Sequence, residues 1–288
     1  MSVSSGTAAP RRYLAAAVQV TSTDDVARNL DRCEALVREA ARRGASLIAL
    51  PENFAFMGPE KAKLALAEPL DGPTLTRLGA LAAELRVHLV AGGFAERASH
   101  ADKVHNTAIL FGADGRQLAA YRKIHLFDVD LPGGQRFRES DAVEAGDTPV
   151  VAETALGRIG LSICYDLRFP ELYRALAALG ADVILVPAAF TLYTGKDHWH
   201  TLLRARAIEN QCFVLAPGQF GQHTPSAGPR GPEKTSARWT YGKSVLVDPW
   251  GIVVAQAPDR ESIAIGEVDL DALAQIRAEL PALRHRRL

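Results

Sequence analysis

Apolar and polar residues follow each other along the chain in blocks that predict strands and amphipathic helices in alternation. The apolar run at 14–20 predicts a buried strand. A helix follows it, with Asp24 as the N-cap and Gly44 just beyond the end. The apolar positions of this helix recur at helical spacing, namely Ala27, Leu30, Cys33, Val37 and Ala41. Cys33 is therefore expected on the core-facing side of the helix.

The same pattern continues through the first third of the chain. Apolar runs at 46–50 and 87–91 predict two further strands. The helix between them has its apolar face on Leu75, Leu78, Leu81 and Leu85. Strands at 107–111 and 117–122 then flank Asp114-Gly115, a dipeptide typical of tight hairpin turns. A β-α-β-α-β run followed by an antiparallel hairpin predicts a mixed sheet.

The second half of the chain has the same character. A hairpin at Leu156-Gly157 leads into an apolar strand at 159–163 that ends directly at Cys164. Pro170 suits the first turn of a helix that ends before Gly180. The remaining predicted elements are a strand at 183–186, a helix at 199–209, and strands at 213–216, 244–247 and 263–268. No internal repeat or linker interrupts this α/β series, and the length alone leaves one or two domains open.

One segment, 221–236, is rich in Gly, Pro and Ser and predicts a long surface loop. Loops of this length are either functional or disordered, so a passive loop and an active-site lid are both open. The passive loop is favoured, because no residue of the segment carries chemistry.

Composition and charge narrow the class of protein. With 288 residues, 48% of them hydrophobic and 23% charged, the chain can form a sizeable core, which argues against a disordered or fibrous protein. Its 33 basic residues equal its 33 acidic ones, so nothing favours a nucleic-acid or anionic-membrane partner. No signal peptide or membrane span is visible either, and a cytoplasmic location is expected.

The three cysteines give no sign of a disulfide framework or a structural zinc site. Cys33, Cys164 and Cys212 cannot all pair with one another, and none belongs to a CxxC element. Cys33 and Cys212 fit the interpretation of small core residues. Cys164 differs, because it follows a buried strand and begins a turn that also contains Asp166 and Arg168.

Three residues at the ends of predicted strands could act together. A thiol is mostly protonated at neutral pH, so a nucleophilic Cys164 needs a base, and the attacked carbonyl oxygen needs a cation. Glu52 and Lys123 each follow a strand and supply these two groups. Taken singly, each residue has a simpler interpretation. Glu52 could be a solvated acid in a loop, and Lys123 could be a solvent-facing lysine that protects a sheet edge. His125 and His198 are weaker candidates for the base.

At these residues the chain resembles the nitrilase superfamily of carbon–nitrogen hydrolases. The similarity extends over 13–268 and rests on three segments in order: Leu50-Pro51-Glu52-Asn53, Arg122-Lys123-Ile124-His125-Leu126-Phe127-Asp128, and Cys164-Tyr165-Asp166-Leu167-Arg168-Phe169-Pro170-Glu171. The resemblance implies that Glu52 is the general base, Lys123 the oxyanion stabiliser and Cys164 the nucleophile. Glu139 matches the second, auxiliary glutamate of the family.

The resemblance also implies a fold and an assembly. The family fold is a four-layer α-β-β-α sandwich with mixed β-sheets, commonly a homodimer or a larger homo-oligomer, and its chemistry needs no cofactor. The expected hydrolase domain covers 13–270. A flexible N-terminal tail at 1–12 precedes it, and a C-terminal extension at 271–288 follows.

Within the superfamily, Cys-Tyr-Asp at the nucleophile resembles the amidases, whereas true nitrilases usually carry Cys-Trp-Glu. Later segments look most like the branch of deaminated glutathione amidases, although His200 stands where that branch usually has Glu. The expected reaction is therefore hydrolysis of a small carboxylate-bearing linear amide through a thioester, with release of ammonia or an amine. An omega-amidase, an N-carbamoyl hydrolase, a nitrilase and a non-catalytic binding dimer are the alternatives.

The resemblance also assigns substrate-binding residues. Arg168 matches a position where related carbamoylases hold a substrate carboxylate, and a guanidinium suits that task. A structural ion pair of Arg168 with Asp166 or Glu171 is an equal alternative. Tyr165 and Thr191 complete the expected substrate-binding set, with the backbone amide of Tyr165 beside Lys123 at the oxyanion.

Overall fold

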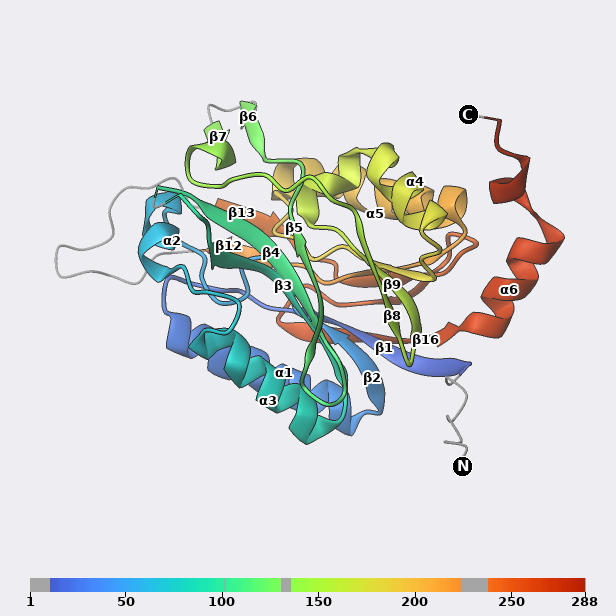
Figure 1. Ribbon diagram of the computed structural model, residues 1–288, viewed down its shortest axis with the longest axis horizontal. Helices are drawn as coiled ribbons and strands as arrows, with labels where there is room; N and C mark the ends of the chain where they lie inside the picture. Colours follow the sequence, from blue (N-terminus) through green and yellow to red (C-terminus); the bar gives the residue numbers. More distant parts are fainter. Residues whose placement is uncertain (1–10, 101, 131–135, 224–237, 288) are drawn as a thin grey trace, which may run out of the picture.

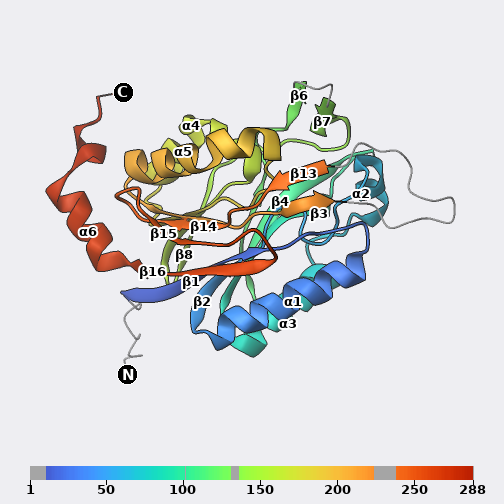
Figure 2. The same ribbon diagram turned by 180° about the vertical axis from the view of Figure 1, so that it is seen from behind.

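The computed structural model describes residues 11–100, 102–130, 136–223 and 238–287. Two six-stranded sheets lie face to face, and helices cover the outer face of each (Figures 1 and 2). This is the four-layer α-β-β-α sandwich that the sequence predicts.

The first sheet is mixed, as predicted. Its strands, in spatial order, are β16 (Ser262–Asp269), β1 (Arg12–Gln19), β2 (Ala45–Ala49), β3 (His88–Arg97), β4 (Val104–Phe111) and β5 (Gln117–Arg122). β1, β2 and β3 run parallel to one another, while β16, β4 and β5 pair antiparallel with their neighbours. The hairpin at Asp114-Gly115 joins β4 to β5.

The second sheet repeats this arrangement with the second half of the chain. Its order is β15 (Val253–Gln256), β14 (Val245–Val247), β11 (Phe213–Ala216), β10 (Val183–Leu185), β9 (Gly157–Leu161) and β8 (Val150–Thr154). β9, β10 and β11 are parallel, and the outer strands are antiparallel. Both sheets therefore have a parallel centre whose strand ends all point to one edge.

Helices α1 (Val26–Arg42) and α3 (Pro73–Leu85) cover the first sheet, and α4 (Pro170–Ala178) and α5 (Leu192–Asn210) cover the second (Figure 2). β1 shows why both faces of a sheet are apolar. Ala15 and Ala17 face the opposite sheet, whereas Ala16 and Val18 pack against the helix layer, and all four are fully buried. Cys33 lies in the same helix–sheet core, as expected.

Elements without a regular apolar pattern were not predicted. These are α2 (Glu60–Leu66), α6 (Leu270–Glu279), β6 (Asp128–Asp130), β7 (Arg136–Arg138), β12 (Phe220–His223), β13 (Arg238–Tyr241) and β15. The start of α5 was placed too late, because 193–198 is polar and hides the first turns of the helix. The predicted loop at 221–236 is wrong over 221–223, which pair with β13. The rest of the predicted loop, 224–236, lies outside the described residues.

The division into a tail at 1–12, a hydrolase domain at 13–270 and an extension at 271–288 stays a prediction. Two elements cross its boundaries: β1 begins at Arg12, and α6 begins at Leu270 and continues to Glu279. The N-cap of α1 was also misplaced by one residue. Asp25, not Asp24, has the extended backbone of a cap, and its carboxylate accepts a hydrogen bond from the Arg28 backbone N–H at 3.0 Å. Hydrophobic spacing alone does not distinguish two adjacent aspartates.

This assignment predicts different effects for the two aspartates. Asp25→Ala removes the cap and should lower the free energy of unfolding by about 1 kcal/mol. Asp24→Ala leaves the cap bond in place and should lower it by less. Urea denaturation of both variants measures the difference, and an equal or larger loss for Asp24→Ala would show that the cap is wrongly assigned.

Candidate active site

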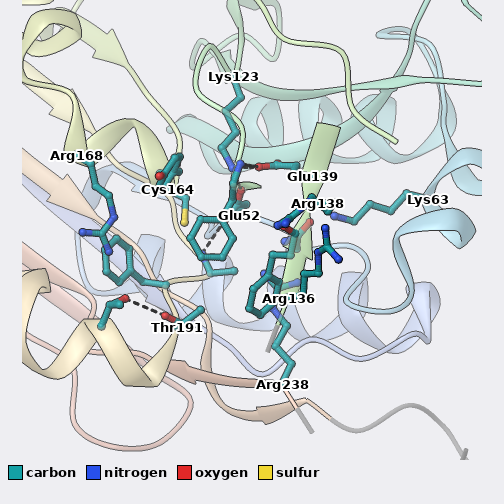
Figure 3. A pocket seen from close by; sticks show the side chains of 17 residues that line it. Glu52, Lys63, Lys123, Arg136, Arg138, Glu139, Cys164, Arg168, Thr191 and Arg238 are labelled. Carbon is teal, nitrogen blue, oxygen red and sulfur yellow. Dashed lines mark hydrogen bonds and ion pairs between the residues drawn. The ribbon is translucent and has the colours of Figure 1, made fainter. Parts of the chain in front are cut away.

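The ends of strands from both sheets bring the predicted residues together. Glu52 follows β2 and Lys123 follows β5 in the first sheet, while Cys164 follows β9 in the second. Glu139 begins a short 3-10 turn directly after β7. Figure 3 shows the four side chains converging on one cavity. Residues up to 112 positions apart (164 − 52) thus meet because the two sheets face each other.

An ion-pair network links three of these residues. The Lys123 ammonium lies 2.9 Å from Glu52 Oε1 and 2.8 Å from Glu139 Oε2. Lys123, Glu52 and Glu139 are all buried, so each charge has lost most of its hydration. Buried charges persist only when they are paired and hydrogen-bonded, and this network provides both.

Asn106, on β4, ties the two carboxylates to each other. Its Nδ2 donates to Glu52 Oε1 at 2.9 Å and to Glu139 Oε1 at 3.1 Å. Its backbone carbonyl also accepts the Lys123 backbone N–H at 2.8 Å. Asn106 therefore contacts every member of the network and offsets the repulsion between two like charges.

Backbone N–H groups hold the remaining carboxylate oxygens. Ala189 donates to Glu52 Oε2 at 2.9 Å, and Phe127 donates to Glu139 Oε2 at 2.7 Å. Gly93 makes the approach possible, because a Cβ there would lie 2.6 Å from Glu52 Cγ and 3.0 Å from Asn106 Oδ1. Both glutamates are thus fixed by several donors and cannot rotate freely.

Cys164 sits in a turn that few side chains tolerate. Its φ of +47° is in the left-handed region, and its N–H donates to the Pro187 carbonyl at 2.9 Å. Asp166, fully buried, stabilises the turn by accepting from the Ile163 backbone N–H at 2.8 Å and the Tyr121 hydroxyl at 2.7 Å. Asp166 therefore has a structural task in placing the thiol.

Charge decides the protonation states of the resting site. Burial alone would raise the pKa of Glu52, but the Lys123 ammonium lowers it to about 2. Burial would lower the pKa of Lys123, but Glu139 and Glu52 raise it well above its usual value. Burial and the Glu52 carboxylate raise the pKa of the Cys164 thiol, and Lys123 offsets only part of this rise. At neutral pH Glu52 is therefore ionised, Lys123 is an ammonium and the Cys164 thiol is neutral.

A cavity of about 120 Å³ opens above these groups. All seven predicted site residues line it: Glu52, Lys123, Glu139, Cys164, Tyr165, Arg168 and Thr191. Thr191 caps α5 and its hydroxyl lies 2.9 Å from that of Thr194. The structure therefore brings together every residue that the sequence suggested, although their roles remain proposals.

Two structural alternatives from the sequence are wrong. Among the described residues, Arg168 forms no ion pair with Asp166 or Glu171; its guanidinium instead lies 5.1 Å from the Phe190 ring centroid. The histidines do not line the cavity. His125 pairs with Asp166 at 2.7 Å, and His198 lies 3.2 Å from a nitrogen of Arg168. Glu52 is thus the base candidate beside the thiol.

Sequence reasoning missed several residues of the site. Asn106 was overlooked because it precedes the apolar run at 107–111, although an Asn within a buried strand is an unusual residue. Further basic residues line the cavity, namely Lys63, Arg136, Arg138 and Arg238. Their elements have no regular apolar pattern, and only Arg138 is next in the chain to a predicted site residue, Glu139.

Two further observations concern the described residues as a whole. No group of three or more His, Cys, Asp or Glu side chains among them could hold a metal ion. None of their helices is both long and apolar enough to cross a membrane.

The sandwich and its cavity define a class of protein. A thiol, an ammonium and two carboxylates at the facing strand ends of an α-β-β-α fold are the arrangement expected of the nitrilase superfamily. The family model described as carbon-nitrogen hydrolase matches residues 14–278. The chain belongs to the carbon–nitrogen hydrolase family, which confirms the predicted resemblance.

Relatives within the family share most of the chain. A deaminated glutathione amidase of Synechocystis is 47% identical over 277 residues, covering 95% of this chain and 98% of its own. The human deaminated glutathione amidase is 44% identical over 281 residues, covering 95% of this chain and 82% of its own.

Solved structures agree with the fold. The NitFhit protein of Caenorhabditis elegans has a TM-score of 0.86 at 39% identity, covering 96% of this chain and 65% of that one. Nit3 of Saccharomyces cerevisiae, a member of branch 10 of the nitrilase superfamily, has a TM-score of 0.82 at 31% identity and covers 99% of this chain and all of that one.

The position of Asn106 predicts a graded loss of stability. Asn106→Ala removes the donor shared by two buried carboxylates and should lower the free energy of unfolding by about 1–3 kcal/mol. Asn106→Asp adds a third negative charge beside them and should lower it further at pH 7. Chemical denaturation measures both. Equal stability of the Ala and Asp variants would contradict the bridging role.

Proposed function

We propose that this protein is an amidase that hydrolyses a small, carboxylate-bearing linear amide of the deaminated glutathione type. The observation that carries the proposal is the Cys164 thiol sharing one buried cavity with the Lys123–Glu52 ion pair. These groups provide a nucleophile, a base and a cation for attack on a carbonyl carbon. No step of the proposed chemistry calls for a cofactor.

The first step moves a proton as the bond to sulfur forms. A free thiolate would place a third negative charge beside one ammonium, so the proton passes from Cys164 to Glu52 while sulfur attacks the carbonyl carbon. The negative charge then develops on the substrate oxygen. The N–H groups of Lys123 point at carboxylates in the resting site, and one is released towards this oxygen once Glu52 is protonated. The Tyr165 backbone N–H completes the oxyanion site.

The second step breaks the C–N bond. Glu52 returns its proton to the leaving nitrogen, the amine departs, and a thioester on Cys164 remains. Glu52 then takes a proton from water as the water attacks the thioester, and the acid product leaves with the thiol restored. Glu139 stays ionised throughout and keeps Lys123 charged.

The substrate class follows from the relatives and the cavity. The two relatives described above are named deaminated glutathione amidases and are 47% and 44% identical. Deaminated glutathione is the 2-oxoglutaryl amide of cysteinylglycine, with a carboxylate at each end. Arg168 lines the cavity and supplies a guanidinium for one of them. 2-Oxoglutaramate, the omega-amidase substrate, has the same acyl half but releases ammonia.

The proposal predicts the result of a direct assay. Cys164→Ala should lower the rate of 2-oxoglutarate release from deaminated glutathione by at least about 10³-fold, because no other nucleophile replaces the thiol. Cys33→Ala, in the helix–sheet core, should retain activity. Intact mass analysis of the wild type during turnover should show the acyl adduct.

Unchanged turnover by Cys164→Ala would refute the mechanism. Release of carbon dioxide from an N-carbamoyl substrate, or turnover of nitriles alone, would favour the alternatives.

Location and assembly belong to the same proposal. The three cysteines are free thiols, which suits the reducing cytoplasm. A homo-oligomer is supported by a group of exposed apolar side chains, Ile208, Trp250 and Ile252. These lie together, because Gly251 approaches Ile208 closely. Sedimentation of the purified protein measures the oligomeric state.

A further inference from the structure

Four basic side chains form one side of the cavity. We call Lys63, Arg136, Arg138 and Arg238 the basic wall. In Figure 3, Cys164 lies between the basic wall and Arg168, so cations occur on both sides of the thiol. Nothing in the thiol chemistry above uses the basic wall, and its charge therefore needs another explanation.

Two arginines of the basic wall lie on β7, and β6 places two aspartates opposite them. Arg136 and Arg138 flank the middle residue of β7, and both pair with Asp130, at 3.3 and 2.8 Å. Asp128, which lies opposite Arg138 in the strand pair, also attracts that guanidinium, whereas Arg136 has, among the described residues, only the longer contact with Asp130. Arg136 is also 70% exposed in its side chain, so it can turn towards an incoming anion.

Lys63 extends this charge to the reacting groups. It is buried, and its ammonium is near enough to Glu52 to help lower the pKa of that carboxyl. Arg238 lies with its guanidinium 5.6 Å from the ring centroid of Phe137, which also lines the cavity. The basic wall thus continues from the solvent-facing side of β7 to the neighbourhood of Glu52.

We propose that the basic wall is a carboxylate-binding subsite for the amine half of the substrate, while Arg168 faces the acyl half. This inference rests on the proposed amidase function. It assigns two ends of the cavity to two ends of a dianionic amide, and it makes the basic wall responsible for preferring amides whose leaving amine is itself an acid.

The direction of the substrate follows from the proton path. The leaving nitrogen must receive a proton from Glu52, so it points to the Glu52 side of the carbonyl carbon. Glu52 and Glu139 are on the same side of Cys164 as the basic wall in Figure 3, and Arg138 directly precedes Glu139 in the chain. The amine half therefore extends towards the basic wall. The acyl half extends the other way, towards Arg168.

The test compares two substrates that differ only at the far end of the amine half. One is deaminated glutathione, and the other is the same molecule with its glycine carboxylate converted to a carboxamide. Both yield 2-oxoglutarate, so one assay gives kcat/KM for each. The wild type should prefer the acid by about 10- to 100-fold, as expected for charge-assisted hydrogen bonds. Added salt should reduce this preference.

Variants then locate the preference. The double variant Arg136→Gln/Arg138→Gln should lose most of the preference, chiefly through a higher KM for the acid. Arg168→Gln should lower kcat/KM for both substrates alike and keep their ratio. Arg116→Gln, at an arginine whose side chain is 85% exposed on the β4–β5 hairpin, is the matched control and should change neither value.

Each outcome is decisive. Equal turnover of the acid and the carboxamide by the wild type, or an equal loss on both substrates in the double variant, would overturn the carboxylate subsite while leaving the amidase function intact. No 2-oxoglutarate from either substrate with the wild type would instead refute the proposed function, and the subsite with it. Activity of the double variant on the carboxamide also shows that it is folded.

Discussion

The site depends on one buried ammonium held between two carboxylates. Without Glu52 and Glu139, the ammonium of Lys123 would be an unpaired charge in a dry interior, which proteins avoid. With both present, burial and the Glu52 carboxylate raise the pKa of the nearby Cys164 thiol, and Lys123 offsets only part of this rise. The ion pairs thus allow Lys123, Glu52 and Glu139 to be buried. The thiol stays protonated until a substrate binds.

The two facing sheets hold the charged groups of the site at a fixed spacing. Glu52 and Lys123 come from the first sheet and Cys164 from the second, so neither sheet alone contains the site. Backbone donors at Ala189 and Phe127 then fix the carboxylates. A preorganised arrangement of this kind stabilises developing charge without reorganisation during the reaction. The three arginines of the basic wall come from β7 and β13, which belong to small two-stranded sheets outside the two large ones.

Most of the fold and the central residues of the site could be predicted from the sequence, for a physical reason. Strands buried on both faces are almost wholly apolar, so Glu52, Lys123 and Cys164 were conspicuous at their ends. Asn106 could not be recognised, because its role depends on which carboxylates lie across the sheet. Arg136, Arg138 and Arg238 lie on short strands with no periodic pattern. The places of Arg136 and Arg238 beside Cys164 are set by tertiary packing, whereas Arg138 directly precedes the predicted Glu139.

The most direct test of this account is the titration of Cys164 itself. Thiolate absorbance in the ultraviolet can be followed against pH for the wild type and for Glu52→Gln, with Cys164→Ala as the blank. We predict no Cys164 thiolate in the wild type at neutral pH, and a lower thiol pKa in Glu52→Gln, because the repelling carboxylate is gone while Lys123 remains. A preformed thiolate in the wild type, or an unchanged titration in Glu52→Gln, would contradict the account.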